Sequence, residues 1–235
     1  MGAQGPASDL RFYGRRRGRR LRRQREQLLE ELLPALELPL PADGSMLDMP
    51  ALFARPMREV WLEIGFGNGE HLIWQAHNHA DIGIIGAEPF LNGVARLLTY
   101  IDENNTDNIR IVADDVRPIM ERLPAASIGR VFVLFPDPWQ KARHHKRRLI
   151  NAQFLDRLAD VMADDAELRL ATDDADYAAC MLHLGLGHSA FEWLARRPGD
   201  WCLRPGDWPA TRYEQKNRSG GHGPVFLQFR RCARN

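Results

Sequence analysis

Cysteines and long apolar runs are scarce in this sequence. Its 235 residues include only Cys180, Cys202 and Cys232, an odd number whose wide spacing fits neither a disulfide framework nor a CxxC metal pair. No stretch approaches the roughly 20 continuous apolar residues of a membrane span, and no apolar run follows the first arginines to form a signal peptide. We therefore expect a cytoplasmic protein with reduced thiols and no membrane association.

A metal-binding pattern is also missing. The sequence has eight histidines, but His77 and His79 merely alternate near a predicted helix end. His144 and His145 lie in a basic run, and no HxxxH spacing or cysteine partner completes a ligand set. We expect no bound metal.

Charge is nearly balanced overall but unevenly placed. The formal net charge is +1, yet the segment from Arg11 to Arg25 contains no acidic residue, and a second basic run extends from Lys141 to Arg148. Positive fields of this kind suit a nucleic-acid backbone, because neutralising phosphates releases counterions. The alternative for the N-terminal run is a solvated or disordered tail, and charge alone leaves both interpretations open.

The chain length allows one substantial core preceded by a tail. Helically spaced leucines precede Pro34, which we expect to end that helix. The predicted organisation is a basic N-terminal tail and helix over residues 1–33, a linker over 34–56 and the main domain over 57–235.

From Glu59 onward, short apolar runs alternate with segments of helical pattern, which is typical of an α/β domain with a mostly parallel sheet and helices on both faces. Residues 195–223 have no periodicity, and such a long irregular stretch is usually functional. The predicted strands are Val60–Ile64, Ile82–Ala87, Ile109–Ala113, Arg130–Phe135, Glu167–Ala171, Phe191–Leu194 and Val225–Arg231.

A glycine-rich turn follows the first predicted strand. Glu63 precedes Gly65, Gly67 and Gly69 in the sequence EIGFGNG, where glycines let the backbone turn tightly and a ligand approach closely. The GxGxxG dinucleotide fingerprint is not met, since the third glycine comes one position early. The segment resembles the first motif of class I S-adenosylmethionine methyltransferases, which implies a Rossmann-like fold and a place for Glu63 near the ammonium group of the cofactor.

Acidic residues follow the next two predicted strands. Glu88 ends the second strand, where a carboxylate can accept hydrogen bonds from both ribose hydroxyls of a nucleoside cofactor. Asp114 and Asp115 follow the third strand, where an acid can accept from the amino group of adenine. The turn and the two acids together indicate a nucleoside-cofactor site.

The fourth predicted strand leads into a distinctive loop. The sequence RVFVLFPDPWQKARHHKRRLI resembles closely the signature of the bacterial tRNA (guanine-N7)-methyltransferase family. The resemblance extends to LEIGFGNGE, GAEPF, NIRIVADDV, LRLATDDADY and the C-terminal TxYE, so it covers most of the chain. It implies transfer of a methyl group from S-adenosylmethionine to N7 of the guanine at position 46, in the variable loop of tRNA, by a monomer or homodimer.

The same resemblance implies roles for individual residues. Asp137 would be catalytic and would also contact the cofactor, and family spacing favours Asp115 over Asp114 as the adenine ligand. The implied substrate contacts are Lys141, Asp173, Thr211, Arg212, Tyr213 and Glu214. The implied RNA contacts are Arg143, His144, His145, Lys146, Arg147 and Arg148.

Three features of these segments have a purely structural alternative. Asp173 and Asp174 follow the fifth predicted strand, where one of them is expected to cap the next helix. Thr211 and Glu214 match the capping-box pattern [ST]-x-x-E. Trp139 is suited either to stacking on a base or to packing its own loop.

The chemistry of Asp137 can be argued without the family. Guanine N7 carries a free lone pair and no proton, so its methylation needs no general base but creates positive charge on the purine. A carboxylate held between Pro136 and Pro138 can orient the base and stabilise that charge. The rival activities are methylation of an amino group, RNA binding without catalysis, and nicotinamide-dependent oxidation, which the glycine spacing disfavours.

Overall fold

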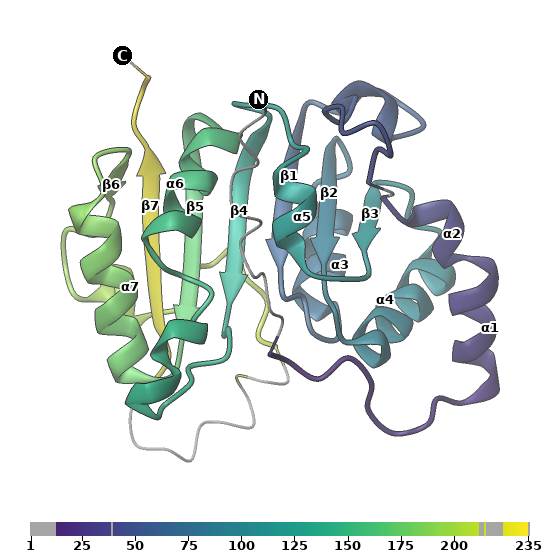
Figure 1. Cartoon of the computed structure of the whole chain (residues 1–235), viewed down its shortest axis with the longest axis horizontal. Coiled ribbons are helices and arrows are strands. Elements are labelled where there is room, and N and C mark those ends of the chain that lie inside the picture. The colour runs from purple at the N-terminus through teal and green to yellow at the C-terminus, as the bar shows by residue number, and fades with distance from the viewer. Residues whose placement is uncertain (1–12, 39, 212–213, 215–222, 235) are drawn as a thin grey trace, which may run out of the picture.

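A computed structural model of the chain describes residues 13–38, 40–211, 214 and 223–234. Its centre is a seven-stranded sheet in the order β3-β2-β1-β4-β5-β7-β6, in which β7 runs antiparallel to both neighbours (Figure 1). The strands are β1 (Glu59–Ile64), β2 (Ile82–Ala87), β3 (Ile109–Val112), β4 (Ile128–Leu134), β5 (Met162–Thr172), β6 (Phe191–Trp193) and β7 (Val225–Arg231).

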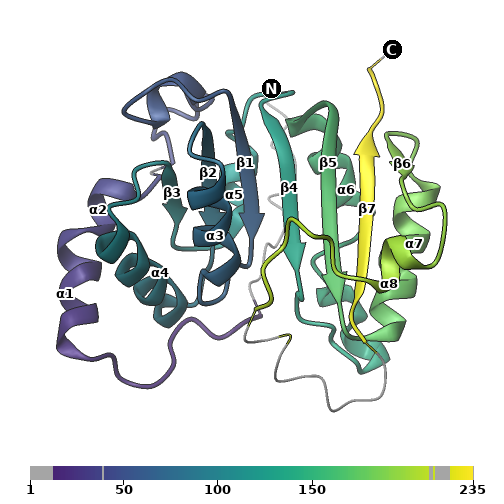
Figure 2. The same cartoon turned by 180° about the vertical axis from the view of Figure 1, so that it is seen from behind.

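Helices cover both faces of this sheet. In Figures 1 and 2, α5, α6 and α7 lie on one face, α3 and α4 lie on the other, and α1 and α2 pack beside α4 and β3. The helices are α1 (Arg23–Glu31), α2 (Leu33–Leu36), η1 (Met49–Leu52), α3 (Glu70–Asn78), α4 (Leu91–Asn104), α5 (Val116–Met120), η2 (Ala142–Arg147), α6 (Ala152–Val161), α7 (Ala175–Gly187) and α8 (Gly199–Cys202).

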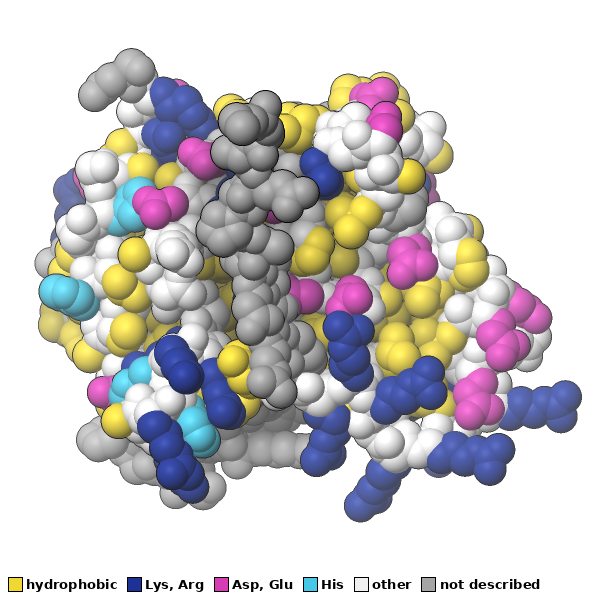
Figure 3. All heavy atoms as spheres, in the orientation of Figure 1, with side chains coloured by type: hydrophobic (Ala, Val, Ile, Leu, Met, Phe, Trp, Pro, Cys, Tyr) yellow, Lys and Arg dark blue, Asp and Glu magenta, His cyan; other side chains and the backbone are white. Residues whose placement is uncertain are grey.

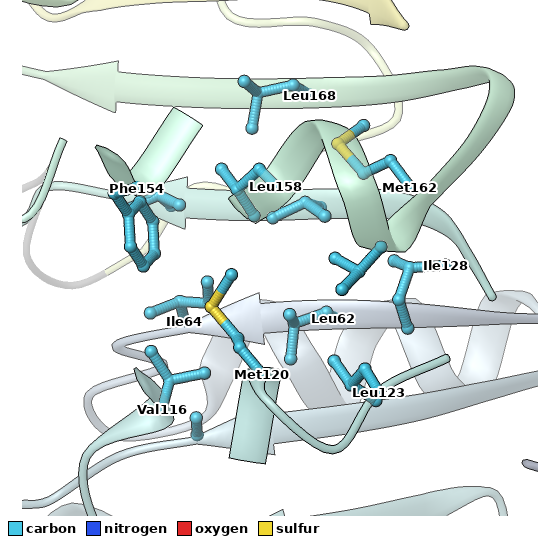
Figure 4. Packing of buried hydrophobic residues seen from close by; sticks show 14 of the residues in the cluster. Leu62, Ile64, Val116, Met120, Leu123, Ile128, Phe154, Leu158, Met162 and Leu168 are labelled. Carbon is cyan, nitrogen blue, oxygen red and sulfur yellow. The ribbon is translucent and has the colours of Figure 1, made fainter. Parts of the chain in front are cut away.

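The buried side chains form one hydrophobic cluster on each face. Leu62 and Ile64 of β1 point to the face of α5 and α6, where they pack near Met120 and Leu158 (Figure 4). Trp61, the neighbour of Leu62, belongs to the cluster on the opposite face. This alternation follows from the two-residue period of a strand, and full burial of each such side chain contributes roughly 1.5–3 kcal/mol.

All seven predicted strands are present, so the predicted α/β architecture is confirmed. The largest boundary error concerns β5, which begins at Met162 rather than Glu167. The pairing of β4 with β5 shifts register here, and Asp165 has φ +64°. This irregular segment contains two exposed acids, which interrupt the apolar pattern of a strand. The sequence pattern therefore places the start of β5 too late.

The segment 34–56, which the sequence predicts to be a linker, packs against the sheet. Pro34 does not stop the helical region, because it lies in the first turn of α2, where a missing N–H costs nothing. Leu38 donates its backbone N–H to the carbonyl of Ile111 on β3, and Phe53 is buried. Close contact between Phe53 and Gly83 leaves no room for a Cβ on β2.

Candidate active site

The predicted site residues gather at one edge of the sheet. β1 to β5 run parallel, so their carboxyl ends meet at the lower edge in Figure 1, where open α/β sheets bind ligands. Lys and Arg side chains also gather along this lower part of the surface (Figure 3).

The glycine turn after β1 has the conformation that its sequence predicts. Gly65, Gly67 and Gly69 have φ values of +75°, +56° and +78°, which only glycine adopts readily. A Cβ built on Gly65 or Gly67 meets no atom within 4 Å, so the turn borders open space on that side. On its other side, a Cβ on Gly93 of α4 would lie 2.1 Å from the carbonyl oxygen of Gly67. The turn therefore packs closely against α4 on one side and borders open space on the other.

Glu88, at the end of β2, is bound to that turn. Its Oε2 accepts the backbone N–H of Gly67 at 2.8 Å, and its Oε1 accepts the backbone N–H of Phe90 at 2.9 Å. Burial raises the pKa of this carboxyl, the two N–H donors oppose the rise, and the negative charges of Asp137 and Glu63 add to it. Three acids that are 25 or more residues apart in the chain therefore share one electrostatic environment.

Glu63, in β1, is almost fully buried, with 2% of its surface exposed. Its Oε2 lies 2.7 Å from Nδ1 of His71, in the first turns of α3. No hydrogen bond to its other oxygen, Oε1, is seen within the described part of the chain. The sequence pattern predicted the position of Glu63 but not its histidine partner.

The two aspartates after β3 are both engaged. Asp115 caps the N-terminus of α5, and its carboxylate also accepts from the guanidinium of Arg117. Asp114 forms an ion pair of 2.7 Å with Arg16. A contact between Asp115 and adenine stays a prediction, and it would use a carboxylate that Arg117 already orients.

Asp137 lies in a strained loop after β4. Phe135 and Trp139, on either side of it, have φ values of +53° and +48°, an unfavourable conformation for large side chains. Phe135 donates its backbone N–H to Ala171 on β5, which fixes the start of the loop. The Asp137 side chain is exposed. Strain of this kind is found where a loop must hold a functional group in one orientation.

Arg148 has a different role from the RNA contact that the sequence predicted. It is buried, with 6% of its surface exposed, and donates from Nε to the carbonyl of Pro138 at 2.9 Å. It also pairs with Asp176 of α7 and lies 4.7 Å above the ring of Tyr177. Arg148 therefore braces the Asp137 loop against α7.

The rest of the basic run forms η2, beside the Asp137 loop. Lys141, Arg143 and Lys146 are exposed. The pKa of His144 is lowered, first by burial and then by the surrounding positive charges of the run. The ring of Trp139 meets that of His144 edge on, so in this structure the tryptophan packs its own loop.

The N-terminal arginine-rich segment crosses the same edge, which the sequence did not reveal. Gly18 donates its N–H to Oδ1 of Asn92 at 2.7 Å, and the Leu91 N–H bonds to the carbonyl of Arg16. Tyr13 packs against Trp139, and the guanidinium of Arg147 lies over both rings. The sequence feature that could have indicated this packing is Gly18, a glycine inside the arginine run. In the structure a Cβ at this position would lie 2.8 Å from the ring of Phe90, so a larger residue would collide there.

The remaining predicted substrate residues fall in three places. Asp174, beside Asp173, caps α7 through the N–H of Tyr177, so the expected helix cap is confirmed for one of the pair. Thr211 and Glu214 exchange the reciprocal hydrogen bonds of a capping box, at 3.3 and 3.4 Å. Arg212 and Tyr213 lie outside the described residues.

No described helix is long and apolar enough to cross a membrane. Within the same part of the chain, no group of three or more His, Cys, Asp or Glu side chains is placed to hold a metal ion.

The sheet order, the open glycine turn, the acid in β1 and the acids after β2 and β4 together define a class I S-adenosylmethionine-dependent methyltransferase. Comparison with known proteins agrees with this class. Residues 57–227 match the model of a family described as "Putative methyltransferase". An rRNA methylase from Streptococcus thermophilus has a similar fold, with a TM-score of 0.51 and 10% identity over 79% of this chain and 92% of that one.

Two curated relatives are much more similar in sequence. Both are named tRNA (guanine-N(7)-)-methyltransferase: that of Rhodospirillum rubrum is 49% identical over 97% of this chain and 91% of its own length, and that of Paramagnetospirillum magneticum is 47% identical over 97% and 95%. This chain belongs to the tRNA (guanine-N(7)-)-methyltransferase family.

Proposed function

We propose that this protein methylates N7 of guanine in tRNA, at position 46 of the variable loop, with S-adenosylmethionine as the methyl donor. The observation that carries the proposal is the bond of Glu88 to an open glycine turn, with the charges of Glu63 and Asp137 near enough to act on it, in a chain nearly half identical to the named relatives.

The residues at the edge fit the cofactor. When bound, S-adenosylmethionine supplies an electrophilic methyl group on a sulfonium. The open side of Gly65 and Gly67 gives room for a ligand to approach the backbone. Glu63 offers a negative charge to the ammonium group, and Glu88 retains lone pairs for two ribose hydroxyls beside its two N–H donors. Asp115 is the proposed acceptor for the adenine amino group.

Asp137 is the proposed catalytic residue. It is exposed at the sheet edge on a loop held by Phe135 and Arg148, so its carboxylate can meet a guanine base without moving the backbone. By accepting hydrogen bonds from the N–H groups of guanine, it would orient N7 and stabilise the positive charge that develops on the purine.

The basic surface at this edge is the proposed tRNA site. Arg143, His144, His145, Lys146 and Arg147 would hold phosphates while the guanine leaves its stack, which costs a few kcal/mol. Proposed contacts with the substrate itself come from Lys141, Asp173, Thr211, Arg212, Tyr213 and Glu214.

The product distinguishes this function from methylation of an amino group. Unmodified tRNA is incubated with the protein and S-adenosylmethionine, then treated with borohydride and aniline, which cleave the chain at N7-methylguanosine and not at amino-methylated bases. We expect cleavage at position 46, and none in a control tRNA that has adenine there. Methylated tRNA that resists cleavage would establish the rival activity, and absence of cofactor binding would leave only RNA binding.

A further inference from the structure

A line of buried hydrogen bonds leads from the loop after α8 to the carboxylate of Glu63. The backbone carbonyl of Asp207 accepts from Nε2 of Gln75 at 2.9 Å, and this same nitrogen lies 3.0 Å from Nε2 of His71. Nδ1 of His71 then lies 2.7 Å from Oε2 of Glu63. Glu63, His71 and Gln75 have exposures of 2%, 3% and 1%, so water does not compete for the bonds among these three side chains.

The backbone carbonyl of Asp207 determines which group donates and which accepts in each of these hydrogen bonds. A backbone carbonyl only accepts, so the side-chain nitrogen of Gln75, not its oxygen, must face Asp207. The same NH2 group then donates to Nε2 of His71, which must be unprotonated. The single proton of the imidazole is therefore on Nδ1 and is donated to Glu63, and a doubly protonated ring would set an N–H against the NH2 of Gln75.

The surroundings hold this arrangement in place. His71 packs edge on against Phe132 of β4, with ring centroids 4.7 Å apart, and against Trp208 at 6.0 Å. The Asp207 side chain, on the loop that supplies the carbonyl, is paired with the buried Arg169 at 2.6 Å. The amide oxygen of Gln75 is buried with no hydrogen-bond partner within the described part of the chain. Leaving a buried acceptor unpaired costs free energy. The amide nevertheless keeps this orientation, because both hydrogen bonds of its nitrogen require it.

We propose that His71 is a positioning residue for cofactor binding: it holds one oxygen of Glu63 so that the other faces the cofactor, and Gln75 fixes its tautomer. The inference rests on the proposed function, in which Glu63 binds the ammonium group. A carboxylate with one oxygen fixed keeps a single orientation, whereas a buried carboxylate with no donor would be poorly solvated and free to turn. The line also ties Glu63 to the loop that leads to Thr211.

The test compares substitutions that keep or remove the donor at Nδ1. The amide nitrogen of Asn occupies about the place of Nδ1, and that of Gln about the place of Nε2. His71→Asn therefore keeps the donor to Glu63, while His71→Gln and His71→Leu remove it. The control is His77→Leu, on the same helix, where the histidine is exposed and bonds only to Thr106 within the described residues.

Affinity for S-adenosylhomocysteine is measured by calorimetry on full-length proteins, with thermal unfolding to verify that each variant is folded. We expect His71→Leu and His71→Gln to weaken binding by about tenfold or more, as loss of a hydrogen bond to a charged group does. His71→Asn and His77→Leu should bind nearly as the unchanged protein does. Equal affinity in all variants, or a loss in His71→Asn as large as in His71→Leu, overturns the proposal.

A second measurement reads the tautomer directly. In protein labelled with 15N-histidine, the His71 signals are those that His71→Asn lacks. They should show a neutral ring protonated at Nδ1, and a His71 ring protonated at Nε2 overturns the proposal. Glu63→Gln distinguishes a failure of the proposed role of Glu63 from a failure of the inference about His71. If it leaves affinity unchanged, the proposed role of Glu63 fails whichever tautomer His71 has, whereas weak binding by Glu63→Gln with normal binding by His71→Leu refutes the inference alone.

Discussion

The carboxylate of Glu88 accepts a hydrogen bond from the backbone N–H of Gly67 across 2.8 Å, and this contact joins the end of β2 to the turn after β1. The two elements are 21 residues apart in the chain. This hydrogen bond fixes the position of the glycine turn relative to Glu88, the acid proposed to hold the ribose. The cofactor site therefore depends on the carboxylate of Glu88, which loses hydration because it is buried.

The pKa of Glu88 gives cofactor binding a pH dependence. Because burial raises this pKa above the ordinary value, the carboxyl takes up a proton at a higher pH in the folded protein than in the unfolded chain. Protonation removes an acceptor for the ribose, so affinity for S-adenosylhomocysteine should fall as the pH is lowered through the raised pKa. Calorimetric titration from pH 7.5 downward measures this.

Stability should change in the opposite direction. A raised carboxyl pKa means that the folded state binds the proton more tightly, so this group favours folding at low pH and loses that contribution as pH rises through its folded pKa. The melting temperature of the unchanged protein minus that of Glu88→Gln should increase as the pH falls. A difference that stays constant would show that the pKa of Glu88 is not raised.

Gly93→Ala tests the close approach of α4 to the turn. The added Cβ would lie 2.1 Å from the carbonyl oxygen of Gly67, which is backbone and cannot rotate away. We expect a destabilisation of about 1–3 kcal/mol, as for overpacking, together with weaker cofactor binding. Denaturant unfolding and calorimetry measure the two effects.

Gly187→Ala is the matched control for this substitution. Gly187 is also a helical glycine, the last residue of α7, but a Cβ there meets no atom within 4 Å. We expect unchanged cofactor binding and a stability equal to or up to about 1 kcal/mol above that of the unchanged protein. If both substitutions had the same effect, the contact with Gly67 would not be the cause.

Arg148→Ala should release the Asp137 loop. Its guanidinium donates to the carbonyl of Pro138 and pairs with the largely exposed Asp176, and because Arg148 itself is buried, the bond to Pro138 is the better shielded from water. We expect lower stability and a fall in the rate of methyl transfer, with cofactor affinity retained because Glu63 and Glu88 are untouched. Single-turnover kinetics under saturating tRNA isolates the rate. Unchanged turnover would remove Arg148 from its bracing role.

The exposed part of the basic run should instead govern affinity for tRNA. Each phosphate that the protein no longer neutralises reduces the slope of log affinity against log salt by roughly 0.7–0.9. Arg143→Ala and Lys146→Ala should each lower the slope by about that amount, with stability unchanged since both side chains are in water. Filter binding at several salt concentrations measures the slope, and an unaltered slope would place the RNA elsewhere.

The sequence predicted those features that a local pattern determines. Apolar runs located every strand, and the glycine spacing located the turn, because backbone conformation and sheet burial constrain residue type directly. The acids that follow β2, β3, β4 and β5 lie at one edge of the sheet, as predicted, because parallel strands bring their carboxyl ends together.

The missed features depend on partners far apart in the chain. Arg148 lies in a run of exposed cations, and nothing local distinguishes the one guanidinium that is buried against Asp176. His71 and Gln75 appear as ordinary polar helix residues until Asp207, 132 residues beyond Gln75, supplies the carbonyl. Arg16 similarly finds Asp114 only once the N-terminal segment has crossed the sheet edge.

The proposed function depends on Asp137, which would orient guanine for methylation at N7 at the edge shared with Glu63 and Glu88. The direct measurement is transfer of a labelled methyl group from S-adenosylmethionine to unmodified tRNA by the unchanged protein and by Asp137→Ala, with cofactor affinity measured on both. We expect the substitution to lower transfer by about a hundredfold or more, as removal of an electrostatic stabiliser does, while cofactor binding largely survives. Full transfer by Asp137→Ala would show that Asp137 is not the catalytic residue.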